Sequence, residues 1–454
     1  MSADRPNILL LVIDCLRADR TFGFGATAKT PNLHALADQG VLFDSLITAN
    51  SMTIPCMTTM FTGMYPQRHG VRAMVGSRVS DDVPVLAELL QSNGYTTYAE
   101  ASGPLSPFYR LNRGFDHYNI RDGVESSLLN QWGDDLIARF RNDELEGPWF
   151  MYVHLWGVHR PRQVLPEYNT PEYGKTQYDR AVSSYDAKLG ELFDAIDSSN
   201  TIVMVTGDHG EKIPENELET QVEFLKKSLS GNSSKRANNA WTRQRRKVIA
   251  AARETWVSSA RLLHRVGLVD SPLVSVTGHG YHVYDSLVRV PFIVSGTSNI
   301  PHGEVISDQA RQVDIMPTIL DLAGIGDEIP SHVEGRSLVP EIQGESLEDV
   351  PAFIETCQNS REPSSFYGIR YDGWKYAFDA DNPRIPEELY NLADNPEENR
   401  NVAKELPDKA AELQAMILAH LEKGQQAGSA LVDELSEDEL TGLSEHLKKL
   451  GYVE

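Results

Sequence analysis

Two long apolar runs that end in acidic residues constrain the fold more than any other feature of this chain. Residues 7–14 read NILLLVID and residues 200–211 read NTIVMVTGDHGE. Continuous rather than alternating apolar character is typical of parallel strands that are buried on both faces. Ligands of open α/β sheets bind beyond the carboxyl ends of such strands. We therefore expect Asp14, Asp208 and His209 to lie at one edge of a parallel sheet.

The length and charge of the chain limit its organisation and its partners. Its 454 residues can form a large core, and we expect one large α/β domain followed by a smaller C-terminal subdomain. The formal net charge of -23 argues against general nucleic-acid binding and favours a well-solvated acidic surface.

The three cysteines are odd in number and widely spaced, so they predict no disulfide framework and favour a reducing compartment. The apolar run at residues 8–13 is too short to span a bilayer, and no signal-peptide pattern opens the sequence. From these features we expect a cytoplasmic protein with no transmembrane segment.

Residues 51–63, SMTIPCMTTMFTG, combine a Thr-x-Pro turn with a short apolar segment of helical character. This pattern predicts that Thr53 lies at a helix N-terminus, where backbone N–H groups and the helix dipole favour a neighbouring anion. Taken alone, it is also the pattern of an N-cap threonine before an ordinary helix.

The same segment resembles the sulfatase signature, and residues 64–71 continue the resemblance. Thr53 then stands at the nucleophile position, with Cys56 where a small residue is usual and Met57 where arginine is expected. The resemblance covers most of residues 5–120, 148–212, 277–325 and 365–400.

It implies an alkaline-phosphatase-like sandwich, with a large mostly parallel central sheet flanked by helices and a smaller C-terminal α+β subdomain. We place the metallohydrolase core at residues 1–330 and the C-terminal subdomain with its terminal helices at residues 331–454.

The resemblance also implies a divalent metal site. Asp14, Thr53, Asp208 and His209 are its expected ligands, with Ca²⁺ favoured and Mg²⁺, Mn²⁺ or Zn²⁺ left open. Many sulfatases carry a second aspartate where this chain has Cys15, so the site lacks one expected carboxylate.

Three histidines are candidates for roles near the site. The resemblance places His159 where a general acid or substrate contact is expected, and a neutral imidazole suits that role near pH 7. It implies that His279 contacts the substrate anion or holds a second metal. We interpret His154 as a satisfied core histidine. Residues 102–104, Ser-Gly-Pro, replace the Lys and His that bind sulfate in many sulfatases.

Residues 213–277 form an insertion that we expect to be helical. Between residues 226 and 265 it carries eleven Lys and Arg against a single acid, Glu254. It could pair with acidic surface elsewhere, or it could dock an anionic partner such as a polyanionic glycan or a membrane surface.

The residue type at the nucleophile position determines which ester-cleaving reaction the chain can catalyse. Sulfatases convert Cys or Ser to formylglycine, a route closed to Thr53. The predicted activity is metal-dependent cleavage of sulfate esters. The expected substrate is a sulfated or phosphorylated anion, for example a glycan. One alternative is a phosphodiesterase or phospho-group transferase that uses Thr53, although related enzymes use two metals and the sequence supplies no evident second ligand set. Another is a catalytically inactive binding protein.

Further periodicities predict individual elements. They indicate helices at residues 31–37, 83–90, 184–196, 312–324 and 406–421, and strands at 41–47, 95–101, 148–156, 351–356 and 367–378. Ser436 and Glu439 form a capping-box pattern that predicts a final helix. Arg17 and Asp19 are expected to form a local ion pair.

Overall fold

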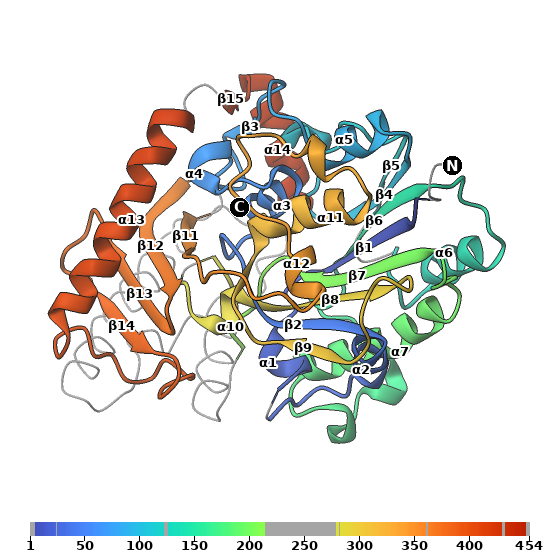
Figure 1. Ribbon diagram of the computed structural model, residues 1–454, viewed down its shortest axis with the longest axis horizontal. Helices are drawn as coiled ribbons and strands as arrows, with labels where there is room; N and C mark the ends of the chain where they lie inside the picture. The colour runs from blue at the N-terminus through green and yellow to red at the C-terminus, as the bar shows by residue number, and fades with distance from the viewer. Residues whose placement is uncertain are drawn as a thin grey trace, which may run out of the picture.

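The computed structural model describes residues 5–23, 25–121, 126–213, 278–280, 282–359, 362–428 and 432–450. Its largest feature is a nine-stranded sheet in the order β10-β2-β8-β7-β1-β6-β4-β5, with β9 paired to β2 (Figure 1). The strands are β1 (Asn7–Ile13), β2 (Gly40–Ile47), β4 (Thr96–Ser102), β5 (His117–Arg121), β6 (Trp149–Leu155), β7 (Thr201–Gly207), β8 (Arg289–Gly296), β9 (Glu304–Ile306) and β10 (Ala310–Arg311).

The two apolar runs form adjacent strands at the centre of this sheet. β1 pairs in parallel with β7 on one side and with β6 on the other. Ile13 lies level with Gly207 in β7 and with Leu155 in β6, so the three strands end together. Only β8 runs antiparallel to its neighbours β2 and β7. The predicted mostly parallel sheet is confirmed. The carboxyl ends of its central strands lie together, at the edge where the site was expected.

Helices cover both faces of the large sheet. Alternate residues of β1 face opposite ways: Ile8, Leu10 and Val12 join one core cluster, and Leu9, Leu11 and Ile13 join the other. The first cluster includes residues of α3 (Thr53–Thr62), α5 (Leu86–Ser92), α11 (Ile315–Leu322), α12 (Val339–Ile342) and α14 (Glu437–Leu450). The second includes residues of α2 (Pro31–Asp38), α6 (Gln131–Arg141) and α7 (Gln177–Phe193). Burial on both faces explains why these strands are uniformly apolar.

A smaller antiparallel sheet lies to one side of the large one (Figure 1). Its strands, in the order β11-β12-β13-β14, are β11 (Ala352–Asn359), β12 (Glu362–Tyr371), β13 (Trp374–Asp379) and β14 (Glu388–Asn391). Helix α13 (Pro407–Gly428) packs against it through Leu413 and Ile417. This sheet and helix confirm the expected C-terminal α+β subdomain, while the division near residue 330 stays a prediction.

Buried ionic contacts join the small sheet to the rest of the protein. Lys375 of β13 is 1% exposed, and its Nζ lies 2.7 Å from an oxygen of Asp285 and 2.8 Å from one of Glu398. Asp285 begins the short helix α10 (Asp285–Val288), directly before strand β8 of the large sheet. The two sheets are therefore linked by a charge cluster that water cannot screen.

Some local predictions need correction. The single strand expected at residues 367–378 is a hairpin, because Asp372 and Gly373 both adopt positive φ and turn the chain between β12 and β13. The helix expected at 184–196 begins earlier, at Gln177, where Thr176 and Asp179 form a capping box. The helix expected at 312–324 comprises a 3-10 turn, Gln312–Asp314, followed by α11.

The capping box of the final helix is confirmed, since Ser436 and Glu439 bond each other reciprocally at the start of α14. The remaining elements of the structure are short. They are α1 (Ala18–Thr21), α4 (Pro66–His69), β3 (Ser77–Val79), β15 (Val432–Glu434) and 3-10 turns at Pro107–Tyr109, Pro166–Tyr168, Pro171–Tyr173 and Gly326–Glu328.

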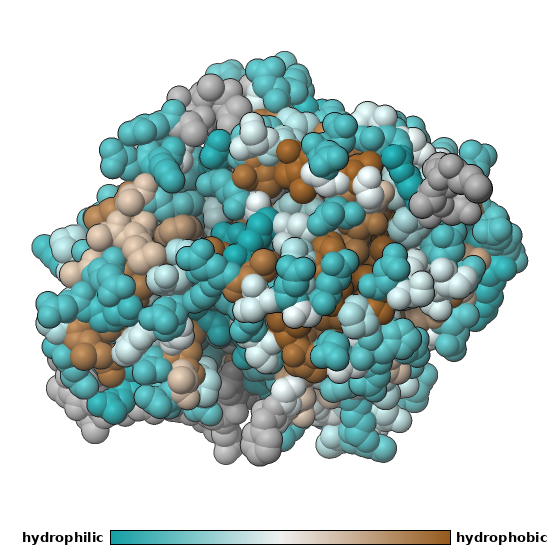
Figure 2. Space-filling model, in the orientation of Figure 1, coloured by the Kyte–Doolittle hydropathy of each residue, from teal (hydrophilic) through white to brown (hydrophobic). Residues whose placement is uncertain are grey.

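Hydrophilic residues cover much of the face shown in Figure 2, and hydrophobic residues gather toward its middle. Among the described residues, no helix is both long and apolar enough to cross a membrane. The basic insertion, apart from Ile213, lies outside the described residues, so its predicted helices and docking role stay predictions.

Candidate active site

The ends of β1 and β7 bring two buried carboxylates together. Asp14 follows β1, Asp208 follows β7, and both side chains are fully buried. One Asp208 oxygen, Oδ1, accepts the backbone N–H of Cys15 at 3.1 Å and that of His209 at 2.8 Å. Asp208 therefore ties the two strand ends to each other, as their neighbouring positions in the sheet allow.

The other carboxylate oxygens have no such partner. Among the residues that the structure describes, neither oxygen of Asp14 and not Oδ2 of Asp208 accepts a hydrogen bond. Buried carboxylates are ordinarily paired, hydrogen-bonded or bound to a cation, since burial without compensation is costly.

His154 of β6 faces the same space, which corrects its prediction as a satisfied core histidine. Its Nε2 lies 3.9 Å from Oδ2 of Asp14 and 3.9 Å from Oδ2 of Asp208, and has no hydrogen-bond partner within the described part of the chain. Its Nδ1 lies 3.1 Å from Oγ of Ser102, which donates to the His154 carbonyl, so Nδ1 carries the proton. The residue is buried as expected, but its Nε2 lone pair points at the carboxylates.

These unpartnered atoms fit a cation. Asp14, His154 and Asp208 each offer a ligand atom, and these atoms lie within 4.8 Å of one another. The second ring nitrogen of His154 bonds Ser102, the arrangement that orients metal-binding histidines in proteins. The site can therefore hold a divalent cation with oxygen and nitrogen ligands.

The pKa values of the two carboxyls diverge. Burial and the charge of Asp208 raise the pKa of Asp14 well above its ordinary value. Burial would also raise the pKa of Asp208, but the His209 and His154 imidazoles and the Cys15 N–H lower it below its ordinary value. If both carboxyls are ionised, their negative charges repel each other, and a bound cation would relieve this repulsion.

Thr53 is the first residue of α3, as the Thr-x-Pro pattern predicts. Its side chain is buried, and its Oγ1 lies 3.3 Å from Nε2 of His209. Nδ1 of His209 lies 2.8 Å from the Gly210 carbonyl and so carries a proton. Nε2 faces the hydroxyl of Thr53 and also lies 3.5 Å from Oδ2 of Asp208.

Met57, which stands where arginine is expected, has apolar surroundings. Met57 is fully buried in the core cluster, and its sulfur accepts from the Tyr152 hydroxyl at 3.7 Å. No cationic group therefore stands one helical turn from Thr53 at this position.

His159 and His279 gather beside His209. The ring centroids of His209 and His279 are 4.5 Å apart, and those of His279 and His159 are 5.2 Å apart. Burial and the neighbouring His209 lower the pKa of His159 to about 3 and that of His279 well below its ordinary value. Both imidazoles are accordingly neutral near pH 7.

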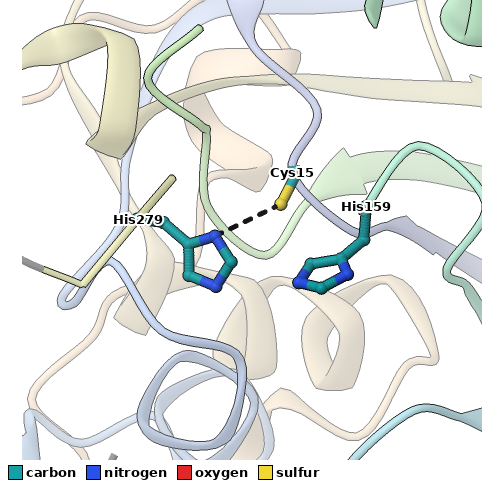
Figure 3. Close-up of side chains that lie close together, drawn as sticks. All are labelled: Cys15, His159 and His279. Atoms are coloured by element: carbon teal, nitrogen blue, oxygen red, sulfur yellow. Dashed lines mark hydrogen bonds between the residues drawn. The ribbon is translucent and has the colours of Figure 1, made fainter. Parts of the chain in front are cut away.

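Cys15, interpreted from the sequence as a lost carboxylate, lies against these rings. Its Sγ is 3.8 Å from Nδ1 of His279 (Figure 3). The same Sγ is 3.9 Å from Nδ1 of His209. Burial and the charge of Asp14 raise the pKa of the thiol. No sequence pattern indicated this grouping, because Cys15 and His279 are 264 positions apart.

Ion pairs frame the site. The predicted Arg17–Asp19 pair is confirmed at 2.7 Å. Arg17 also donates to the Glu211 carbonyl, and the Glu211 carboxylate pairs with Arg160 and Arg162. These contacts fix the segments that follow β1, β6 and β7 relative to one another.

The fold and this site define an α/β protein that collects a hydroxyl, carboxylates and imidazoles at the carboxyl edge of its central sheet. The sulfatase family matches residues 6–325, and the C-terminal family of N-sulphoglucosamine sulphohydrolase matches residues 279–427. The chain therefore belongs to the sulfatase family, and it is a hydrolase of sulfuric or phosphoric esters.

Individual relatives are distant but cover most of the chain. An N-acetylglucosamine-6-O-sulfatase of Bacteroides thetaiotaomicron is 22% identical over 88% of this chain and 82% of its own length. A structure solved with its substrate D-glucosamine-2-N,6-O-disulfate has a TM-score of 0.66 at 17% identity, covering 93% of this chain and 98% of that one. The phosphonate monoester hydrolase of Agrobacterium radiobacter has a TM-score of 0.67 at 18% identity, covering 93% and 96%.

Proposed function

We propose that this protein hydrolyses sulfate esters of an anionic saccharide in a metal-dependent reaction, with Thr53 as the nucleophile. The observation that carries the proposal is the contact between Thr53 Oγ1 and His209 Nε2 at 3.3 Å, at the start of α3 and beside two buried carboxylates. An imidazole nitrogen beside a hydroxyl is the arrangement that activates a nucleophile.

The proposed reaction has two steps, transfer of the sulfate group to Thr53 and its hydrolysis by water. As the Thr53 hydroxyl passes its proton to Nε2 of His209, its oxygen forms a bond to the ester sulfur, and the bond from sulfur to the leaving oxygen breaks. The leaving oxygen takes up the proton that Nε2 of His209 received, which gives the free alcohol and leaves a sulfate ester on Thr53. Water then attacks that sulfur, releasing sulfate and restoring the hydroxyl.

Two further groups of side chains take part. His279, which like His159 is neutral near pH 7, would donate a ring N–H to the leaving oxygen rather than act as an imidazolium acid. The N–H of His159 is held by the Arg160 carbonyl, so His159 would contact the substrate without donating to that oxygen. The resemblance implies Asp14, Thr53, Asp208 and His209 as metal ligands. Because Nε2 of His209 takes the Thr53 proton in this reaction, we propose that Asp14, Asp208 and the Thr53 oxygen hold the cation together with His154. The cation would neutralise substrate charge and lower the pKa of the threonine hydroxyl.

The identity of the metal is a separate proposal. Ca²⁺ prefers a shell of oxygen ligands, whereas imidazole suits Zn²⁺ and other transition metals. Two carboxylates with His154 and His209 at hand form a mixed set. The donor chemistry therefore supports Mn²⁺ or Zn²⁺ at least as well as the Ca²⁺ favoured by the resemblance.

Phosphate esters are the second candidate substrates, and Thr53 itself favours them. A threonine has no route to formylglycine, and a threonine oxygen can attack phosphorus as well as sulfur. The fold accommodates both chemistries, since a phosphonate monoester hydrolase shares it. For a saccharide substrate, the support is the relative named for N-acetylglucosamine 6-O-sulfate and the structure solved with a disulfated glucosamine.

A panel of esters tests the reaction. Purified protein would be assayed on aryl sulfate, N-acetylglucosamine 6-sulfate, and phosphate monoester and diester, each with Ca²⁺, Mg²⁺, Mn²⁺ or Zn²⁺. We expect sulfate release that is abolished by chelation. Preference for a phosphate ester would replace the sulfate assignment with the second candidate, and no turnover with any metal or ester would contradict both.

A further inference from the structure

Cys15, His159 and His279 form a compact group of donors outside the carboxylate site. One ligand atom from each, Sγ and two ring nitrogens, lies within 4.8 Å of the others (Figure 3). The group shares no residue with the set formed by Asp14, His154 and Asp208. A third set, Asp14, Cys15 and His209, lies between the two, so the groups adjoin.

The donor types differ between the two groups. The first offers carboxylate oxygens with one imidazole, which suits hard or borderline cations. The second offers a thiol and two imidazoles, the ligand chemistry of zinc. Three protein ligands are also the number at which zinc keeps a fourth position for water or substrate.

We propose that Cys15, His159 and His279 bind a zinc ion, as a second metal site beside the carboxylate site. Zinc bonds of about 2.3 Å to sulfur and about 2.0 Å to nitrogen would separate tetrahedral ligand atoms by roughly 3.3–3.6 Å. The Sγ–Nδ1 separation of Cys15 and His279 is 3.8 Å, so this pair needs little movement, and His159 would close in from within 4.8 Å. As the zinc–sulfur bond forms, the thiol proton leaves to solvent.

The backbone of Cys15 is held in an uncommon conformation that aims its thiol at the histidines. Its φ is 65°, the left-handed region that non-glycine residues seldom occupy. Its N–H donates to Asp208, and its carbonyl accepts from the Tyr178 hydroxyl at 2.7 Å. These bonds stabilise the strained position, and strain of this kind concentrates at functional sites.

The two histidines are also fixed. Nδ1 of His159 lies 2.7 Å from the Arg160 carbonyl and carries the proton, so Nε2 is the ring's acceptor. A pair of backbone hydrogen bonds between Lys212 and Gly278, at 2.8 and 2.9 Å, places His279 at the end of the segment that follows β7. His159 and His279 thus reach Cys15 from separate, independently anchored segments.

The test measures metal binding without substrate, so its result is independent of the proposed ester hydrolysis. Full-length protein would be stripped with a chelator, supplied with Ca²⁺ for the carboxylate site, and titrated with Co²⁺ and then Zn²⁺. We expect a thiolate-to-cobalt absorption band and, in X-ray absorption of the zinc form, one sulfur ligand at about 2.3 Å.

Two cysteine variants give a matched comparison. Cys15→Ser should lose the cobalt band and bind zinc at least about tenfold more weakly, as should His279→Ala. Cys56→Ser is the control, because Cys56 is also a buried free cysteine and its thiol donates to the Asn50 carbonyl instead. It should keep the band.

A wild-type zinc complex without a sulfur ligand would overturn the proposal, as would a cobalt band that survives in folded Cys15→Ser. Thermal melts establish whether each variant folds. If Cys15→Ser does not fold, the sulfur ligand in the wild-type spectrum decides the question by itself.

Discussion

Replacing Thr53 with alanine separates the nucleophile from the rest of the site. Thr53 is 1% exposed, and its hydroxyl contacts the His209 ring and lies beside Asp14. Its loss removes a hydrogen bond worth about 1 kcal/mol and a buried methyl worth about 1 kcal/mol. A loss of ~2 kcal/mol is below the 5–15 kcal/mol stability typical of folded domains, so Thr53→Ala should fold.

The effect on catalysis should be far larger. Without the attacking oxygen, kcat for the preferred ester should fall at least about 10³-fold, or ~4 kcal/mol in the activation free energy. Thr53→Ser keeps the oxygen and should recover most of the activity. Thr58→Ala is the matched control, because Thr58 is a buried threonine of the same helix whose hydroxyl bonds only the Ile54 carbonyl in this structure.

The assay is initial-rate hydrolysis at saturating metal, with thermal melts of all four proteins. The reasoning is refuted if Thr53→Ala retains activity close to wild type, or if Thr53→Ser is as inactive as Thr53→Ala while still folded. Equal losses in Thr53→Ala and Thr58→Ala would indicate damage to the helix rather than removal of a nucleophile.

Four further predictions concern metal binding and stability. His154→Ala should weaken binding of the activating metal by about 10-fold or more, measured by titration of the stripped protein, because Nε2 faces both carboxylates; unchanged affinity would exclude it as a ligand. Chelation should lower the free energy of unfolding by about 2.7 kcal/mol relative to metal at 100 times its Kd, seen as a lower Tm; an unchanged Tm would contradict a tight site. Burial lowers the pKa of His69 to about 3, so between pH 6.5 and 3 the unfolded chain binds a proton that the folded protein does not. The free energy of unfolding should therefore fall as pH drops through this range, by up to about 1.4 kcal/mol per pH unit. Denaturant titrations at several pH values should show that this free energy depends less steeply on pH in His69→Gln. Lys375→Met should cost about 3–5 kcal/mol by leaving Asp285 and Glu398 without their shared cation; a loss under 1 kcal/mol would show that the cluster does not hold the sheets together.

The sequence was most informative where burial dictates residue type. The runs before Asp14 and Asp208 are apolar because β1 and β7 are covered on both faces, so their strand character and polar ends were readable. Likewise Thr53 could be placed at a helix start, since Thr-x-Pro restricts the backbone locally. The order of the strands was not predicted, because periodicity does not specify which strands pair; the family resemblance supplied only the large, mostly parallel sheet.

The errors arose where function depends on contacts between distant residues. His154 lies in a strand whose residues are all buried, so no alternation in the sequence distinguishes a core histidine from one that faces Asp14. Cys15 was interpreted as a missing carboxylate, because its neighbours His159 and His279 approach only after the sheet assembles. The turn at Asp372 was a local signal that the prediction overlooked, since Asp372-Gly373 is a typical hairpin turn and the aromatic alternation changes parity between Tyr371 and Trp374.

The most direct test of the central claim is to identify the residue that carries the transferred group. Protein would be mixed with the preferred ester, quenched in acid within one turnover, digested and analysed by mass spectrometry. The account predicts a sulfate or phosphate ester on the peptide that contains Thr53, absent from Thr53→Ala. A covalent group on any other residue, or product release with no modified Thr53 at any quench time, would contradict it.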